Sequence, residues 1–276
     1  MGLVVRASGR TDRGKVRPNN EDYFLLFDEY KEQKQMDWDR LVSERGRLYI
    51  VADGLGGHRA GEVASREATL AFVEKYYADD PERFRSRLDE YMDHPLKWLL
   101  LASMASAHLA ITDKVEEEPG KYRGMGTTLT AATLLDDRRM FVIHMGDTRL
   151  YILRGDELKQ ITKDHTYIQQ FIDRGEITKE QARHAPGKHM LTRAVGIEHS
   201  DGSPSEPDVY EHDLKAGDRL LLCSDGLTDM LSDEEIKEVL KTARSVSDCT
   251  ETLVNRALDA GGKDNVTVVA IDVVEV

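Results

Sequence analysis

The 276-residue sequence is long enough for one large domain or two small ones, and its 40% hydrophobic and 32% charged residues are typical of a globular protein. Its net charge of −13 argues against nucleic acid and anionic membranes as main partners. The apolar runs have the length of strands, so we expect no transmembrane helix and no signal peptide, and we predict a cytoplasmic chain.

Strand-like and helix-like segments follow one another along the chain without a strict alternation. We expect strands at 4–8, 22–27, 48–52, 127–135, 139–145, 150–154, 219–223 and 265–274. Helices are expected at 60–77, 95–117, 232–242 and 246–260, and Ser232 and Glu235 form a capping-box pattern. Neighbouring strands separated by short polar turns favour antiparallel pairing, so the pattern predicts an α+β sandwich of sheets with helices outside.

Two segments are interpreted as additions to a single domain spanning 1–276. Residues 28–47 carry 11 charged side chains in 20 positions, which predicts a solvated loop or a short exposed helix. Residues 165–207 are polar and are punctuated by glycine and proline, as in "RHAPGKH" and "SDGSPSEP". This composition is typical of a mobile lobe.

Acidic residues stand at the ends of several expected strands, beside apolar runs such as "LYIVADG", "MFVIHMGD" and "RLLLCSDG". They are Glu21, Asp22, Asp53, Asp147, Asp225 and Asp264. A single aspartate in such a place is usually a turn residue, but six are better explained by convergence on one site. Converging carboxylates raise one another's pKa, and divalent cations would stabilise them. Oxygen ligands without Cys or His pairs favour Mg²⁺ or Mn²⁺.

Three further residues near these acids are candidates for the site. Arg17 lies four residues before Glu21 and can bind a phosphate that the metals also bind, although a single arginine is more often only a surface residue. His58 follows on a glycine-rich turn and is a candidate proton donor, although a lone histidine is more often structural. Gly54 allows a backbone carbonyl to approach a metal.

Seven motifs resemble those of the metal-dependent serine/threonine protein phosphatases, the PPM or type 2C family, in its bacterial form. In chain order they are "GKVRPNNEDYF", "VADGLGGHRAGEVAS", "GMGTTLTAATL", "HMGDTRLY", "LTRAVG", "LLLCSDGLTDML" and "GGKDNVTVVAI". Each is weak alone, but seven in the family's order along nearly the whole chain are highly specific. The resemblance implies a four-layer α-β-β-α sandwich of two antiparallel sheets flanked by helices, with a two-metal centre at one end.

The resemblance also implies ligands for two Mn²⁺ or Mg²⁺ ions. By position, Asp53 matches the carboxylate that bridges both metals. Asp225 and Asp264 match the ligands of one metal, and Glu21 and the carbonyl of Gly54 match those of the other.

The remaining positions match supporting roles in the family. Asp147 and Asp229 match acids that bind a third, weaker metal together with the aspartate of "CSDG". Arg17 matches the phosphate-binding arginine, His58 the general acid, and Asp22 a partner of the metal ligands. Residues 165–207 match a variable flap beside the active site.

The implied activity is hydrolysis of phosphoserine and phosphothreonine in proteins. A hydroxide that bridges the two metals attacks phosphorus in line, Arg17 balances the developing charge, and His58 protonates the leaving oxygen. The implied substrates are phosphoproteins, including a bacterial Ser/Thr kinase and its targets in signalling. We expect a monomer with neither a nucleic-acid nor a membrane partner.

Two other functions stay open at this point. One is a catalytically silent member of the fold that binds phosphoproteins, which should lack metal ligands, whereas Asp53, Asp225 and Asp264 are all present. The other is a metal-dependent phosphatase for small phosphorylated molecules, which a comparison of phosphopeptides with phosphometabolites would distinguish.

Overall fold

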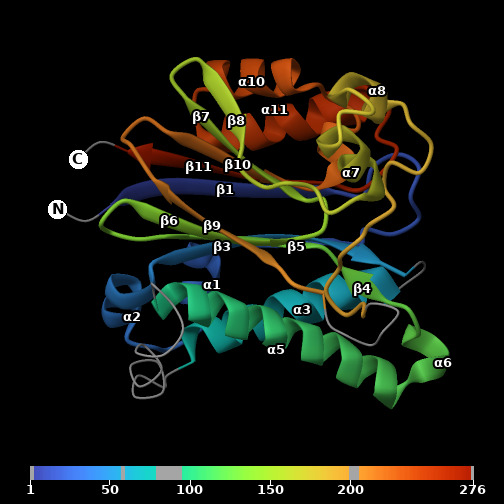
Figure 1. Cartoon of the computed structure of the whole chain (residues 1–276). Coiled ribbons are helices and arrows are strands. Elements are labelled where there is room, and N and C mark those ends of the chain that lie inside the picture. The colour runs from blue at the N-terminus through green and yellow to red at the C-terminus, as the bar shows by residue number, and fades with distance from the viewer. Residues whose placement is uncertain (1–2, 57–59, 79–94, 199–204, 275–276) are drawn as a thin grey trace.

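Two antiparallel sheets packed face to face form the middle of the structure, with helices on both outer sides (Figure 1). The computed structural model describes residues 3–56, 60–78, 95–198 and 205–274. One sheet has the strand order β1 (Val4–Asp12), β11 (Val266–Val274), β10 (Arg219–Cys223), β7 (Arg149–Arg154) and β8 (Glu157–Gln160). The other has the order β2 (Asp22–Leu25), β3 (Arg47–Leu55), β5 (Leu129–Leu134), β6 (Arg139–Met145) and β9 (Asp208–Asp213), and β4 (Gly126–Thr127) pairs with the end of β3.

A pair of long helices covers each outer face (Figure 1). The pair on the β1 sheet is α10 (Asp233–Thr242) and α11 (Val246–Asp259), and the pair on the β3 sheet is α3 (Ala60–Tyr77) and α5 (Pro95–Glu117). Shorter helices are α1 (Phe27–Glu32), α2 (Trp38–Arg45), α6 (Pro119–Tyr122), α7 (Tyr167–Asp173), α8 (Lys179–Arg183) and α9 (Asp225–Thr228). None of the described helices has both the length and the apolar character that a membrane span requires.

Side chains alternate between the two faces of a strand, so the β1 sheet contributes to two apolar cores. On β10, Leu220 and Leu222 belong to the apolar cluster between the sheets, whereas Leu221 and Cys223 belong to the cluster under α10 and α11. Because successive side chains point to opposite faces, a strand buried on both sides needs an unbroken apolar run. The run "RLLLC" satisfies this requirement, and the expected four-layer sandwich is confirmed.

Most expected elements are present with similar bounds, including the capping box of Ser232 and Glu235. Two strands that the pattern did not predict, β8 and β9, are edge strands of their sheets. Edge strands have one free side, and these two carry polar, partly exposed residues in "ELKQ" and "DVYEHD". The periodicity of buried apolar residues therefore gives little signal for them.

The expectation that residues 28–47 are solvated is wrong. They contribute α1 and α2, which bury Phe27, Tyr30 and Trp38 against Tyr77 of α3, with ring centroids 5.2–6.2 Å apart. Arg45 is only 1% exposed, and its Nη1 donates to the backbone carbonyls of residues 76 and 78 at 2.7 and 2.9 Å. A few aromatic residues at helical spacing outweigh the many charges, most of which, unlike Arg45, stay on the outer side of these helices.

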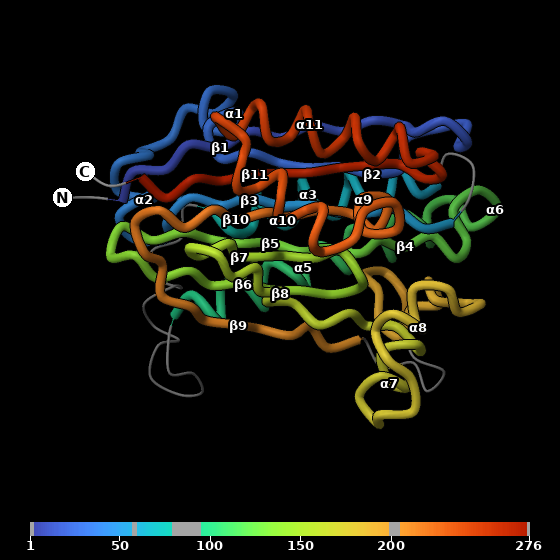
Figure 2. The backbone as a smooth tube through the Cα atoms, turned by 90° about the horizontal axis from the view of Figure 1, so that it is seen from above, coloured from blue at the N-terminus to red at the C-terminus, as the bar shows by residue number. Residues whose placement is uncertain are grey.

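The segment between β8 and β9 contains α7 and α8, which stand out from the sheets at one end of the molecule (Figure 2). A β-bridge between Thr166 and Leu191 joins the start and the return of this segment. We keep the name flap for residues 165–207. Its mobility and its status as a subdomain stay predictions.

We expect Trp38→Ala to lower the free energy of unfolding by about 3–5 kcal/mol, because Trp38 is only 8% exposed and contacts three other aromatic rings. Urea denaturation followed by circular dichroism measures this loss. The control is Leu109→Ala, whose side chain is 58% exposed and which should change stability by less than about 0.5 kcal/mol. Equal, small effects of both variants would show that the aromatic cluster contributes nothing.

Candidate active site

The acidic strand ends meet at the end of the sandwich where α8, α9 and β4 lie (Figure 2). The pairing of β2 with β3 places Asp22 directly opposite Asp53. Asp53 lines a cavity of about 680 Å³ surrounded by acids and a few basic side chains, whereas Asp22 is buried and is not among the lining residues. The charged and glycine residues that line this cavity include Arg17, Glu21, Asp53, Gly54, Asp147, Arg183, Lys188, His189, Asp225, Asp229, Lys263 and Asp264.

The backbone of Asp53 is bonded to Thr127, the last residue of β4, and to Thr128, which follows it. Its N–H donates to Thr128 Oγ1 at 2.9 Å. Its carbonyl accepts from the Thr128 N–H and from Thr127 Oγ1, both at 2.8 Å. Three hydrogen bonds at one residue leave the strand end little freedom. Asp53 is therefore positioned by the hydrogen bonds of its backbone, and its carboxylate oxygens take no part in them.

Gly54 and Gly61 bring three backbones together around Glu21. A Cβ on Gly54 would lie 2.1 Å from the Gly61 carbonyl oxygen, and one on Gly61 would lie 2.6 Å from the Glu21 carboxylate. The Glu21 carbonyl accepts from the Gly54 N–H at 3.0 Å and from Ser65 Oγ at 2.6 Å. Glycine at both positions is required for this close approach, since any side chain would displace Glu21.

Burial and mutual repulsion raise the pKa values of several acids here. The pKa values of Asp53 and Asp147 are held well above their usual range, first by burial and then by neighbouring aspartates. Burial raises the pKa of Asp22 to about 7, although Ser224 Oγ donates to its carboxylate at 2.7 Å. Ionising all of these carboxylates together is therefore unfavourable.

Divalent cations fit this donor set. Asp22 Oδ1 and Asp225 Oδ1 are buried and have no hydrogen-bond partner within the described residues. Buried polar atoms normally have partners, so such orphaned oxygens point to a missing positive charge. The carboxylate and carbonyl oxygens favour hard cations such as Mg²⁺ or Mn²⁺.

Arg17 lies on the rim of the cavity, and its side chain is about half exposed. Its Nη2 donates to Asp264 Oδ2 at 2.6 Å, and this bond, opposed by partial burial, raises the pKa of the guanidinium. A guanidinium has five donor hydrogens, so a contact with Asp264 leaves others for a phosphate. The structure thus brings Arg17 to the acids, as its spacing from Glu21 predicted.

Two flap residues that the sequence analysis did not single out reach into the same cavity. His189 donates from Nδ1 to Asp225 at 3.0 Å and from Nε2 to Asp229 at 3.1 Å. Lys188 Nζ donates to the other oxygen of Asp229 at 2.7 Å. The bonds to both aspartates raise the pKa of His189 to about 10. In the sequence both residues fall in "RHAPGKH", whose glycine and proline indicate a loop but no ligand.

The acids expected to bind a third ion lie in this part of the cavity. Ligand atoms of Asp147, His189 and Asp225 all lie within 4.8 Å of one another. Burial alone would raise the pKa of Asp229, but the bonds from His189 and Lys188 hold it below its usual range. The positively charged side chains of Lys188 and His189 therefore neutralise part of the acidic cluster.

His58, the expected general acid, lies outside the described residues, and its role stays a prediction.

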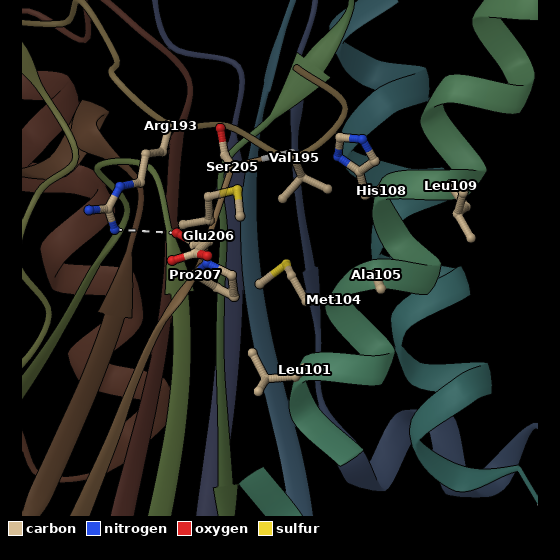
Figure 3. Close-up of a pocket in the computed structure, with 11 residues that line it drawn as sticks. Leu101, Met104, Ala105, His108, Leu109, Arg193, Val195, Ser205, Glu206 and Pro207 are labelled. Atoms are coloured by element: carbon tan, nitrogen blue, oxygen red, sulfur yellow. Dashed lines mark hydrogen bonds between the residues drawn. The ribbon is translucent and has the colours of Figure 1, made fainter. Parts of the chain in front are cut away.

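A second cavity, of about 760 Å³, lies between α5 and the return segment of the flap and is lined mainly by apolar side chains (Figure 3). Leu101, Met104 and His108 of α5 form one wall, and Val195 lies opposite. No cluster of carboxylates lines it among the described residues. The acidic cavity is therefore the better candidate for the active site, although the apolar one is slightly larger.

Comparison with known proteins agrees with this geometry. The family model described as "Protein phosphatase 2C" matches residues 32–263. The chain belongs to the protein phosphatase 2C family. The family resemblance carried by the seven motifs is thereby confirmed, as is the fold that it implies.

Individual 2C phosphatases match nearly the whole chain. Serine/threonine protein phosphatase PstP of Mycobacterium tuberculosis is 41% identical over 273 residues, which are 99% of this chain and 46% of that protein. The chain thus spans about half the length of that relative. Serine/threonine phosphatase stp of Listeria innocua is 34% identical over 272 residues, 97% of this chain and 96% of that protein. The crystal structure of the PstP catalytic domain in complex with two manganese ions has a TM-score of 0.77 and 40% identity, covering 99% of this chain and 100% of that one.

In this 2C-family chain, we expect Asp22→Asn to stabilise the metal-free protein more at pH 8 than at pH 5. The folded-state pKa of about 7 exceeds the usual value near 3.9 of an unfolded chain, so ionising Asp22 costs stability as the pH rises through about 7. Thermal melting of chelator-treated protein measures the difference. Asp39→Asn, on the exposed side of α2, should show no such pH dependence. A stability gain independent of pH would contradict the raised pKa.

We expect Lys188→Ala to tighten the weakest Mn²⁺ site by about fivefold, or ~1 kcal/mol, because the variant removes a positive charge 2.7 Å from Asp229. Isothermal titration of metal-free protein with Mn²⁺ measures the change. Lys31→Ala, at an exposed lysine of α1 away from the cavity, is the control and should leave the isotherm unchanged. Weaker binding in Lys188→Ala would mean that the lysine supports the metal site instead of competing with the cation.

Proposed function

We propose that this chain hydrolyses phosphoserine and phosphothreonine in proteins with the help of two divalent cations. The observation that carries the proposal is the meeting of Asp53, Asp225 and Asp264 with Glu21 in one cavity beside Arg17. The names of the relatives, serine/threonine phosphatases of bacteria, support the same reaction. The chain spans about half the length of the PstP relative, so the activity of that whole protein is a proposal for this chain.

The proposed ligand set applies the roles that the family resemblance implies to acids that line this cavity. Asp53 would bind both cations. Asp225 and Asp264 would hold one, and Glu21 with the Gly54 carbonyl would hold the other. Divalent cations in such a site supply Lewis acidity and make water nucleophilic at neutral pH. The solved PstP structure with two manganese ions supports two as the number.

Arg17 is the proposed binding group for the substrate phosphate. Its guanidinium already lies on Asp264 and is charged at neutral pH, as arginine always is, and the bond to that carboxylate raises its pKa further. A phosphate oxygen that enters the cavity would therefore meet a fixed positive charge next to the cations. Arg17 would neutralise the charge that develops on the equatorial oxygens during in-line displacement.

The flap residues Lys188 and His189 border the same space and present positive charge toward it.

The sequence-based expectation of a Ser/Thr kinase as the opposing enzyme remains part of this proposal, as does a monomeric state. A cytoplasmic location also stays a proposal.

We expect hydrolysis of a phosphothreonine peptide to require Mn²⁺ or Mg²⁺, to stop with EDTA, and to fall by at least about a hundredfold in Asp225→Ala, because that variant loses a metal ligand. Phosphate release measures it, with the exposed Asp39→Asn as control. Circular dichroism establishes that Asp225→Ala stays folded. Metal-independent turnover, or full activity in the variant, would overturn the metal assignment.

Two further outcomes would replace the proposed substrate class. Faster turnover of small phosphorylated metabolites than of phosphopeptides would identify a small-molecule phosphatase. Folded, Mn²⁺-loaded protein that binds phosphopeptides without hydrolysing them would identify a silent binding protein.

A further inference from the structure

His165 is bonded to both polar backbone groups of Gly146, the residue before Asp147. The His165 N–H donates to the Gly146 carbonyl at 2.7 Å, and the Gly146 N–H donates to His165 Nδ1 at 3.2 Å. Gly146 has a φ of 112°, and a Cβ there would lie 2.5 Å from Thr128. Glycine is therefore required at this position, and it has no side chain that could fix the turn. The orientation of Asp147 therefore depends on His165.

The hydrogen bonds determine the tautomer of His165. Since Nδ1 accepts from Gly146, the proton lies on Nε2, which donates to Asp208 Oδ2 at 3.2 Å. Arg193 Nη1 lies 3.3 Å from the same Nε2, and with the proton there it donates to Asp208 and the Glu206 carbonyl and not to the ring. Asp208 also accepts from Arg193 Nη1 at 2.9 Å and from Tyr210 Oη at 3.0 Å. His165 is only 6% exposed, and burial lowers its pKa, which agrees with a neutral ring.

The same histidine joins the two ends of the flap. Its carbonyl accepts from the Thr192 N–H at 2.8 Å, next to the bridge between Thr166 and Leu191. Arg193, in the return segment, shares Asp208 with it and also donates to the backbone carbonyl of Glu206 (Figure 3). The base of the flap and the Asp147 turn therefore form one hydrogen-bonded unit centred on His165.

We propose that His165, oriented by Asp208, is a positioning residue that holds the Asp147 turn and the base of the flap in one arrangement and thereby sets the affinity of the cation that Asp147 helps to bind. The proposal rests on the metal-dependent function proposed above. His165 lies behind the ligand and acts through Gly146, as residues that orient metal ligands commonly do.

Two substitutions at His165 separate this role from simple packing. The amide oxygen of Asn lies near the position of Nδ1 and can accept from the Gly146 N–H. The longer side chain of Gln places its amide near Nε2, where it can donate to Asp208 but leaves the Gly146 N–H without its acceptor. A positioning role through Gly146 therefore predicts rescue by Asn and no rescue by Gln.

Isothermal titration of the metal-free full chain with Mn²⁺, in the absence of substrate, tests the proposal. We expect His165→Gln to weaken the weakest Mn²⁺ site by about tenfold or more, and His165→Asn to remain within about threefold of the native chain. Asp208→Asn, measured in parallel, should weaken this site as well, because the carboxylate that orients the ring is lost. This variant keeps the test valid if a His165 variant fails to fold.

The matched controls are His212→Asn and His212→Gln, on the same strand as Asp208, where the histidine has no bond to the Asp147 turn. Both should leave the isotherm unchanged. Equal effects of Asn and Gln at His165, or native Mn²⁺ binding in His165→Gln and Asp208→Asn, would overturn the proposal. If the native chain binds Mn²⁺ but hydrolyses no phosphopeptide, the proposed function fails, whereas a selective loss in His165→Gln would still support the positioning role.

Discussion

Repulsion among carboxylates crowded into a poorly solvated cavity is the constraint on which the functional end of this molecule depends. Burial and neighbouring aspartates raise the pKa values of Asp53 and Asp147, and buried oxygens of Asp22 and Asp225 lack partners within the described residues. Ionising such a group costs free energy unless positive charge enters the cavity. The fold therefore keeps in place a set of carboxylates that positive charge would stabilise.

The sandwich supplies the rigidity that this arrangement needs. Strand ends are held by sheet hydrogen bonds, and the backbone of Asp53 is additionally bonded to Thr127 and Thr128. Glycines at positions 54 and 61 allow the strand and the start of α3 to close around Glu21. The ligands thus stand on elements whose positions are determined by two apolar cores, so the repulsion cannot easily be relieved by moving the backbone.

Positive charge also comes from the chain itself. Lys188 and His189 extend from the flap to Asp225 and Asp229, where they partly balance the acids. The base of this flap is bonded through His165 to the turn that carries Asp147. The flap and the acidic cavity are therefore connected in two places, once through the charged groups of Lys188 and His189 and once through the hydrogen bonds of His165.

The sequence by itself determined the family, the fold class and the identity of the acids, because strand alternation, helix periodicity and motif order are properties of neighbouring residues. It did not reveal the burial of Tyr30 and Trp38 within residues 28–47, since charge content hides a few well-placed aromatic side chains. Only the tertiary structure decided that Lys188 and His189 enter the acidic cavity and that His165 supports the Asp147 turn. These contacts join segments far apart in the chain, and the path of a loop between them is not encoded in any local pattern.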